Sequence, residues 1–145
     1  MPEIKHTFRI QCAEETIHRA LTTLEGLSGW WTTDVQGNPA PDGELVFRFN
    51  DGAVQFTMDV KKTFPPHEVL WVCKAGHPEW VDTLISFDLN PPGNGEGILV
   101  LFKHSGWGST EGIYGNCTFD WGRYLRSLKM FVETGKGNPH PEAMA

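Results

Sequence analysis

Apolar and polar residues alternate strictly in several short segments of the chain. Residues 4–10 place Ile, His, Phe and Ile at every second position, and residues 54–60 repeat such an alternation without a break. A period of two is typical of a β-strand with one buried face. Applied along the chain, it predicts six strands, at residues 4–10, 45–49, 54–60, 69–74, 83–89 and 98–104. In the last of these, parity puts Val100, Phe102 and His104 on the inward face.

Helical periodicity begins directly after the first strand. Its apolar positions are Ala13, Ile17, Ala20, Leu21 and Leu24. This spacing places them on one face of a helix. Residues 27–31 indicate a second, shorter helical turn with Ser28 as its cap. Residues 34–43 are expected to form a loop because they contain two prolines and an Asp-Gly pair.

A longer amphipathic segment follows the last strand. Its apolar positions share one helix face and are Trp121, Leu125, Leu128 and Val132. They predict a helix from about Tyr114 to Glu133 that ends at Gly135. A helix of this length spans about 30 Å, enough to cover a small sheet. We therefore expect an α+β fold: a six-stranded antiparallel sheet curved around a long C-terminal helix, with two short N-terminal helical segments.

Length and composition narrow the class of protein. The 145 residues suit a single domain that covers the whole range 1–145. A net charge of −6 argues against binding to nucleic acid or to an anionic membrane surface. No segment is apolar for long enough to cross a membrane. The three cysteines are widely spaced, which favours reduced thiols and a cytoplasmic location over a disulfide framework.

The expected helix and sheet can meet in two ways, which the pattern leaves open. Large side chains either fill the space between them or leave a cavity for an apolar ligand. Trp30 and Trp31 either flank the mouth of that cavity or anchor a short helix to the core. The candidate ligand-binding residues lie on the inward faces of both layers and are Trp30, Phe47, Phe56, Met58, Trp71, Ile85, Phe87, Phe102, His104, Trp121, Tyr124, Leu125 and Leu128.

Four short motifs, taken in order, are similar to those of a known family. They are Gly29-Trp30-Trp31, the strand end His104-Ser105-Gly106-Trp107, the helix segment 121–128 and its tail 133–137. With the order of elements, they resemble the START-like (SRPBCC) superfamily, which has the helix-grip fold. Within it, the chain resembles the bacterial branch related to the activator of the heat-shock-protein-90 ATPase. The resemblance implies a cavity between helix and sheet for a hydrophobic small molecule, aromatic or lipid-like. It implies no particular reaction.

His104 is the candidate catalytic residue, because it ends a strand on the expected cavity side. It could act as a general acid and base together with Tyr124, or be a hydrogen-bonded part of the core. The sequence contains no paired metal-ligand spacing, nucleophile elbow, phosphate loop or dinucleotide fingerprint. We therefore expect no metal and no cofactor, and binding is a better hypothesis than catalysis.

Three functions compete at this point. The leading one is binding of a hydrophobic small molecule. The second is a cyclase- or hydrolase-like enzyme that uses His104. The third is a co-chaperone that resembles the ATPase activator, for which we expect no stimulation of the chaperone. The chain is expected to be a monomer or a homodimer, since a free strand edge or the outward residues Leu99 and Leu101 could support association.

Overall fold

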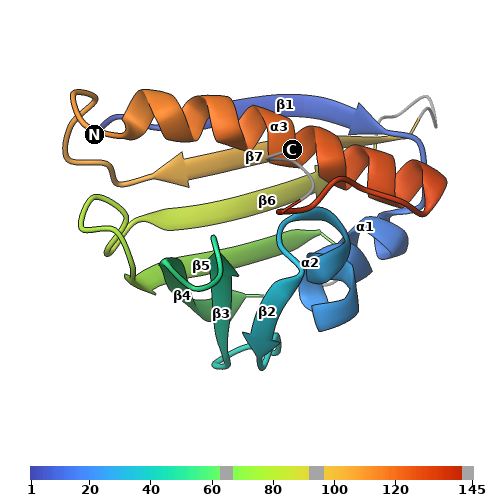
Figure 1. Ribbon diagram of the computed structural model, residues 1–145. Coiled ribbons are helices and arrows are strands. Elements are labelled where there is room, and N and C mark those ends of the chain that lie inside the picture. Colours follow the sequence, from blue (N-terminus) through green and yellow to red (C-terminus); the bar gives the residue numbers. More distant parts are fainter. Residues whose placement is uncertain (63–66, 92–96, 142–145) are drawn as a thin grey trace.

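In the computed structural model, which describes residues 1–62, 67–91 and 97–141, seven strands form one antiparallel sheet (Figure 1). The order across the sheet is β1-β7-β6-β5-β4-β3-β2. The strands are β1 Ile4–Ile10, β2 Asp34–Gly37, β3 Glu44–Phe49, β4 Val54–Lys62, β5 Glu68–Ala75, β6 Leu84–Asn90 and β7 Ile98–Ser105. The predicted α+β fold with an antiparallel sheet and a long C-terminal helix is confirmed, with one strand more than expected.

The additional strand is β2, which lies in the segment predicted to be a loop. It pairs with β3, so that Asp34 stands opposite Arg48 and Gly37 opposite Leu45. The Asp34 and Arg48 side chains also form an ion pair at 3.5 Å. The prediction of six strands was wrong because no residue of β2 is buried. An edge strand without a buried face has no apolar alternation by which to recognise it.

Three helices occur in the described residues: α1 Glu14–Thr22, α2 Leu24–Trp30 and α3 Tyr114–Thr134. α3 lies across the face of the sheet in front of β1 and β7, and α1 and α2 pack near its C-terminal end (Figure 1). α2 begins three residues earlier than predicted, and its cap is Thr23 instead of Ser28. The Thr23 hydroxyl accepts a hydrogen bond from the Gly26 amide at 2.9 Å. No helix in the described part of the chain is long and apolar enough to span a membrane.

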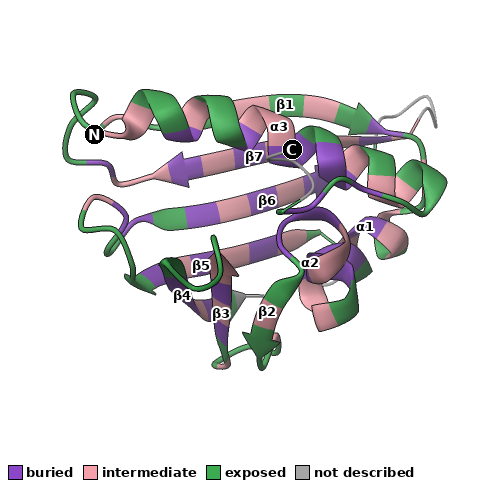
Figure 2. Cartoon of the chain, viewed as in Figure 1, coloured by how far each residue is buried: buried purple, intermediate pink, exposed green. Residues whose placement is uncertain are grey.

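Alternating residues of the central strands are buried (Figure 2). Val100, Phe102 and His104 of β7 are buried, as predicted. The register sets Ile85 and Phe87 of β6 opposite His104 and Phe102. The alternation along each strand therefore determines which side chains face α3. Side chains from neighbouring strands form one buried layer on that face of the sheet.

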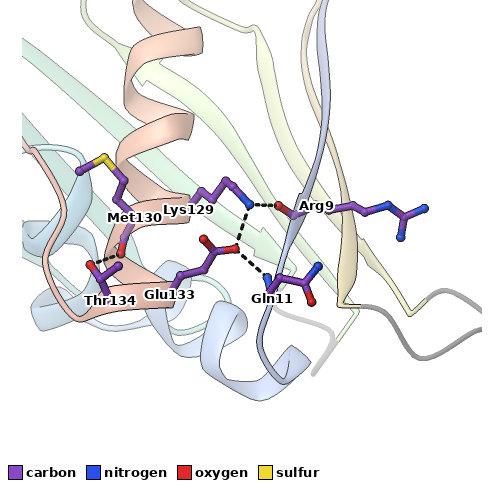
Figure 3. A network of polar contacts seen from close by, with 6 residues as sticks. All are labelled: Arg9, Gln11, Lys129, Met130, Glu133 and Thr134. Carbon is purple, nitrogen blue, oxygen red and sulfur yellow. Dashed lines mark hydrogen bonds and ion pairs between the residues drawn. The ribbon is translucent and has the colours of Figure 1, made fainter.

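Side chains from the end of α3 cover the free edge of β1 (Figure 3). Lys129 Nζ donates to the Arg9 carbonyl at 2.6 Å and to Glu133 Oε2 at 2.8 Å. The same carboxylate oxygen accepts a hydrogen bond from the Gln11 amide at 2.8 Å. Because unpaired backbone groups at a sheet edge invite pairing with other chains, these contacts protect the edge and also fix the helix on the sheet.

Candidate ligand-binding site

Aromatic rings fill the middle of the interface between α3 and the sheet. Between ring centroids, Trp121 lies 4.6 Å from Phe102 and 5.0 Å from Trp31, and Phe87 lies 5.1 Å from Phe102. Packing at this density leaves no room for a ligand between these rings. Ten of the thirteen predicted contact residues are buried in this interior: Trp30, Phe47, Met58, Trp71, Ile85, Phe87, Phe102, His104, Leu125 and Leu128.

A cleft of about 270 Å³ opens where the packed interior ends, beside the N-terminal half of α3. Its other walls are the β3–β4 turn, the segment before β6, and the segments that follow α2 and α3. The lining residues are Trp31, Phe49, Asn50, Val54, Phe56, His77, Trp80, Ile113, Cys117, Asp120, Trp121, Tyr124 and His140. Of the predicted contacts, Phe56, Trp121 and Tyr124 belong to this set.

Six of the lining side chains are aromatic; three of them stack in series, and a fourth continues the series at a tilt. Phe56 stacks on Trp80 at 4.0 Å, and Trp80 stacks on Trp121 at 6.0 Å, with interplanar angles of 27° and 20°. Trp31 follows Trp121 at 5.0 Å and 34°. Phe49 meets Phe56 edge-on at 75°. A flat apolar molecule could extend this series with its own ring.

Polar groups in the lining are few. Asp120 is its one carboxylate, and none of the described residues that line it is lysine or arginine. His77 Nδ1 accepts a hydrogen bond from the Glu79 amide at 3.1 Å, and His140 Nε2 accepts one from the Asn50 amide at 3.0 Å. In this arrangement the accepting ring nitrogen of each histidine carries no proton, so it offers no hydrogen to a ligand. The described residues contain no group of three or more His, Cys, Asp or Glu placed to hold a metal ion.

His104 is part of a buried chain of hydrogen bonds in the packed interior. Trp121 Nε1 donates to His104 Nδ1 at 3.0 Å. The neutral ring therefore carries its proton on Nε2, which donates to Thr83 Oγ1 at 2.8 Å, and that hydroxyl donates to the Trp80 carbonyl at 2.5 Å. Burial lowers the pKa of His104 from 6.5 to about 3. Both ring nitrogens are occupied, so this geometry favours a structural role over the predicted catalytic one.

The hydroxyl and thiol groups of the cleft keep their protons at neutral pH. Burial raises the pKa of the Cys117 thiol to about 11, although the Trp80 indole donates to its sulfur at 3.2 Å. Burial also raises the pKa of the Tyr124 hydroxyl. A thiol or phenol without its anionic form is a poor nucleophile. The cleft is therefore better suited to binding than to covalent chemistry.

Comparison with known proteins agrees with this architecture. Residues 11–133 match the family model described as "Activator of Hsp90 ATPase homolog 1-like protein". The chain belongs to this family. The predicted resemblance to the bacterial branch related to the ATPase activator is thereby confirmed. No curated protein matches the sequence of this family member.

Solved structures share the fold of this member of the Activator of Hsp90 ATPase homolog 1-like family. The Aha1 dimer from Colwellia psychrerythraea is 37% identical, covers 94% of this chain and 100% of its own, and has a TM-score of 0.84. Protein MLL2253 from Mesorhizobium loti is 18% identical over 90% of this chain and 96% of its own, with a TM-score of 0.79. CalU16 from Micromonospora echinospora is 20% identical over 98% and 79%, with a TM-score of 0.75. The latter two show the fold alone.

In this family member, Trp30 and Trp31 have different roles: one lines the cleft and the other anchors a helix. Trp31 lines the cleft. Trp30 anchors α2 to α1, since its indole donates to the Ala20 carbonyl at 3.0 Å. The helical spacing of α3 could have identified two cleft-lining residues that the predicted ligand contacts do not include. Cys117 lies four residues before Trp121 on the same face of α3, and Asp120 lies three residues after Cys117.

Proposed function

We propose that this protein binds a small, flat, apolar molecule in the cleft beside the N-terminal half of α3. The fold is that of a ligand-binding family. One observation carries the proposal: the series of aromatic rings that fills the interior ends at an opening lined by further rings. Concave, mostly apolar sites with a few polar groups are the usual places for small-molecule binding.

The size of the cleft limits the size of the ligand. A cavity of about 150 Å³ is enough to hold benzene. The volume of about 270 Å³ therefore suits a molecule of one or two fused rings. A long-chain lipid needs considerably more space, so of the two ligand classes implied by the resemblance, the aromatic one is favoured.

The tryptophans of the protein provide the test of this proposal. Three of the six line the cleft and three do not: the lining set is Trp31, Trp80 and Trp121, and the other set is Trp30, Trp71 and Trp107. Titration of isotope-labelled protein with naphthalenemethanol should shift the indole N–H resonances of the lining set most strongly in heteronuclear NMR spectra. Equal shifts in all six resonances, or no shift up to the solubility limit, would contradict the proposal.

A pair of matched substitutions localises the binding. Val54 lies at the rim of the cleft with 38% exposure, and Leu84 lies on the outward face of β6 with 39% exposure. Val54→Trp places a large ring in the cleft mouth and should weaken naphthalenemethanol binding about tenfold in calorimetry. Leu84→Trp adds the same ring at the same exposure and should leave the affinity unchanged. Equal effects of the two variants would place the ligand elsewhere.

We also propose that the protein forms a homodimer. The supporting observation is that the Colwellia relative, 37% identical, is described as a dimer. Light scattering after gel filtration should give a mass about twice the 16.3 kDa of one chain. A single species of 16.3 kDa across a wide range of concentrations would contradict the dimer.

Family membership makes stimulation of an Hsp90-type ATPase the second candidate function. The prediction from the sequence is that no stimulation occurs. An assay of chaperone ATPase activity with increasing amounts of this chain shows whether stimulation occurs. A dose-dependent increase would favour an activator, and repeating it with Val54→Trp shows whether activation depends on the cleft.

A further inference from the structure

We infer that the cleft selects organic cations: aromatic amines whose ring lies among the cleft tryptophans and whose ammonium group meets Asp120. The inference rests on the proposed function, because it assigns the charge of the ligand for the same cleft. The Asp120 side chain is exposed at the cleft, and no hydrogen bond or ion pair joins its carboxylate to another residue that the structure describes. Its carboxylate is therefore available to a ligand.

No positive charge in the lining competes for that carboxylate. Of the two lining histidines, His77 accepts a hydrogen bond from the Glu79 amide and His140 accepts one from the Asn50 amide. The nearest arginine along α3, Arg123, lies over the Phe119 ring at 5.8 Å. Phe119 is 67% exposed and belongs to the outer face of the helix. Arg123 is three residues from Asp120, and, after the effect of burial, its charge lowers the pKa of the lining residue Tyr124 while that of Asp120 raises it. The contact with Phe119 nevertheless places the guanidinium outside the cleft lining.

At Cys117, the charged groups that act on the cleft are carboxylates. After burial, the charges of Asp120 and Glu79 are the causes that raise the pKa of the Cys117 thiol, which lines the cleft. Glu79 stands at the start of α3, where its carboxylate accepts the Ile113 amide at 3.2 Å. Two carboxylates thus act on the same small volume, and the net charge of −6 acts in the same direction at longer range.

The aromatic lining adds to this preference. The faces of tryptophan rings attract cations through their quadrupole, and cages of such rings are a common recognition device for ammonium groups. A ligand with a carboxylate would meet repulsion from Asp120 and find no cationic partner among the lining residues. Fatty acids and other anionic molecules are therefore disfavoured, and an aromatic amine satisfies both the rings and the carboxylate.

Three probes that share one ring system test the inference: naphthylmethylamine, naphthalenemethanol and naphthoic acid, which are cationic, neutral and anionic at neutral pH. Calorimetry at low salt should show the amine binding about three- to fivefold more tightly than the alcohol, and the acid binding most weakly. Asp120→Asn should reduce the amine to the affinity of the alcohol. Asp59→Asn removes the same charge from the outward face of β4 and should keep the preference.

The outcomes separate this inference from the function on which it rests. If the alcohol binds but the acid binds as tightly as the amine, the charge assignment is overturned and the cleft remains a binding site. The same holds if the preference for the amine survives in Asp120→Asn. If none of the three probes binds, both proposals are overturned.

Discussion

A single buried imidazole, His104, makes the stability of this protein depend on pH. In the folded state burial lowers the pKa of the ring from 6.5 to about 3. The unfolded chain takes up a proton as the pH falls below about 6.5. Between these two values the unfolded state binds more protons, so the contribution of His104 to stability is complete above pH 6.5 and is lost as the pH falls. The slope approaches about 1.4 kcal/mol per pH unit.

His104→Gln tests this dependence, because a glutamine amide offers one acceptor and one donor but does not titrate. At pH 7 the variant should be less stable by about 1–3 kcal/mol, since its hydrogen bonds to Trp121 and Thr83 are imperfect. The difference from the wild type, measured by urea unfolding, should shrink as the pH is lowered from 6.5 to 4. His77→Gln, at an exposed position, is the control for loss of a histidine as such. A constant difference across this range would contradict the account.

Strand parity predicted correctly that His104 faces inward, but it could not predict how deep the residue lies. Phe56 and Phe102 have the same inward parity in their strands, yet Phe56 lines the cleft and Phe102 packs against Trp121. The difference arises from their position along the strand relative to α3, which is a tertiary property. For this reason the sequence identified the faces of the interior but not which of the inward residues line the cleft.

At the scale of elements, the contact between α3 and β1 fixes the helix on the sheet and protects the edge of β1. A variant with Lys129→Ala and Glu133→Ala removes the hydrogen bonds from Lys129 to the Arg9 carbonyl and from the Gln11 amide to Glu133. Hydrogen exchange at the Gln11 amide should become about fivefold faster, which corresponds to about 1 kcal/mol of local stability. Thr134→Ala is the control, because its hydroxyl bonds only within the helix end (Figure 3). Equal acceleration in the control would show general fraying of α3.

Elements were predictable where one face is buried. β4 has a regular apolar face, and α3 has a regular apolar stripe, so both were found with nearly correct bounds. β2 differs because only Val35 of its four residues is partly buried, and the strand is held by pairing with β3 and by the Asp34–Arg48 ion pair. Pairing between distant segments has no period in the sequence, and a short edge strand of this kind therefore goes undetected.

At the scale of the whole molecule, the segment after α3 joins two walls of the cleft. The His140 amide donates to the Trp31 carbonyl at 2.8 Å, and its carbonyl accepts from the Thr33 amide at 3.1 Å. Its ring accepts from the Asn50 amide in the β3–β4 turn. The sequence gives no indication of these contacts, because residues 135–141 are rich in glycine and proline and have no periodicity. Only the assembled fold brings His140 to the cleft.

Removal of this segment should therefore destabilise the fold and weaken the cleft together. A chain that ends at Gly137 loses three hydrogen bonds of His140 and the bond from the Asn138 amide to Ser127 Oγ. At about 1 kcal/mol each, these bonds amount to about 3–4 kcal/mol in the free energy of unfolding, measured with urea. His140→Ala keeps the backbone bonds and should lose only about 1 kcal/mol. Naphthalenemethanol affinity should fall in the same order, because both variants release Asn50 but only the deletion releases Trp31. If His140→Ala were as damaging as the deletion, the ring would hold the cleft together and the backbone bridge would contribute nothing.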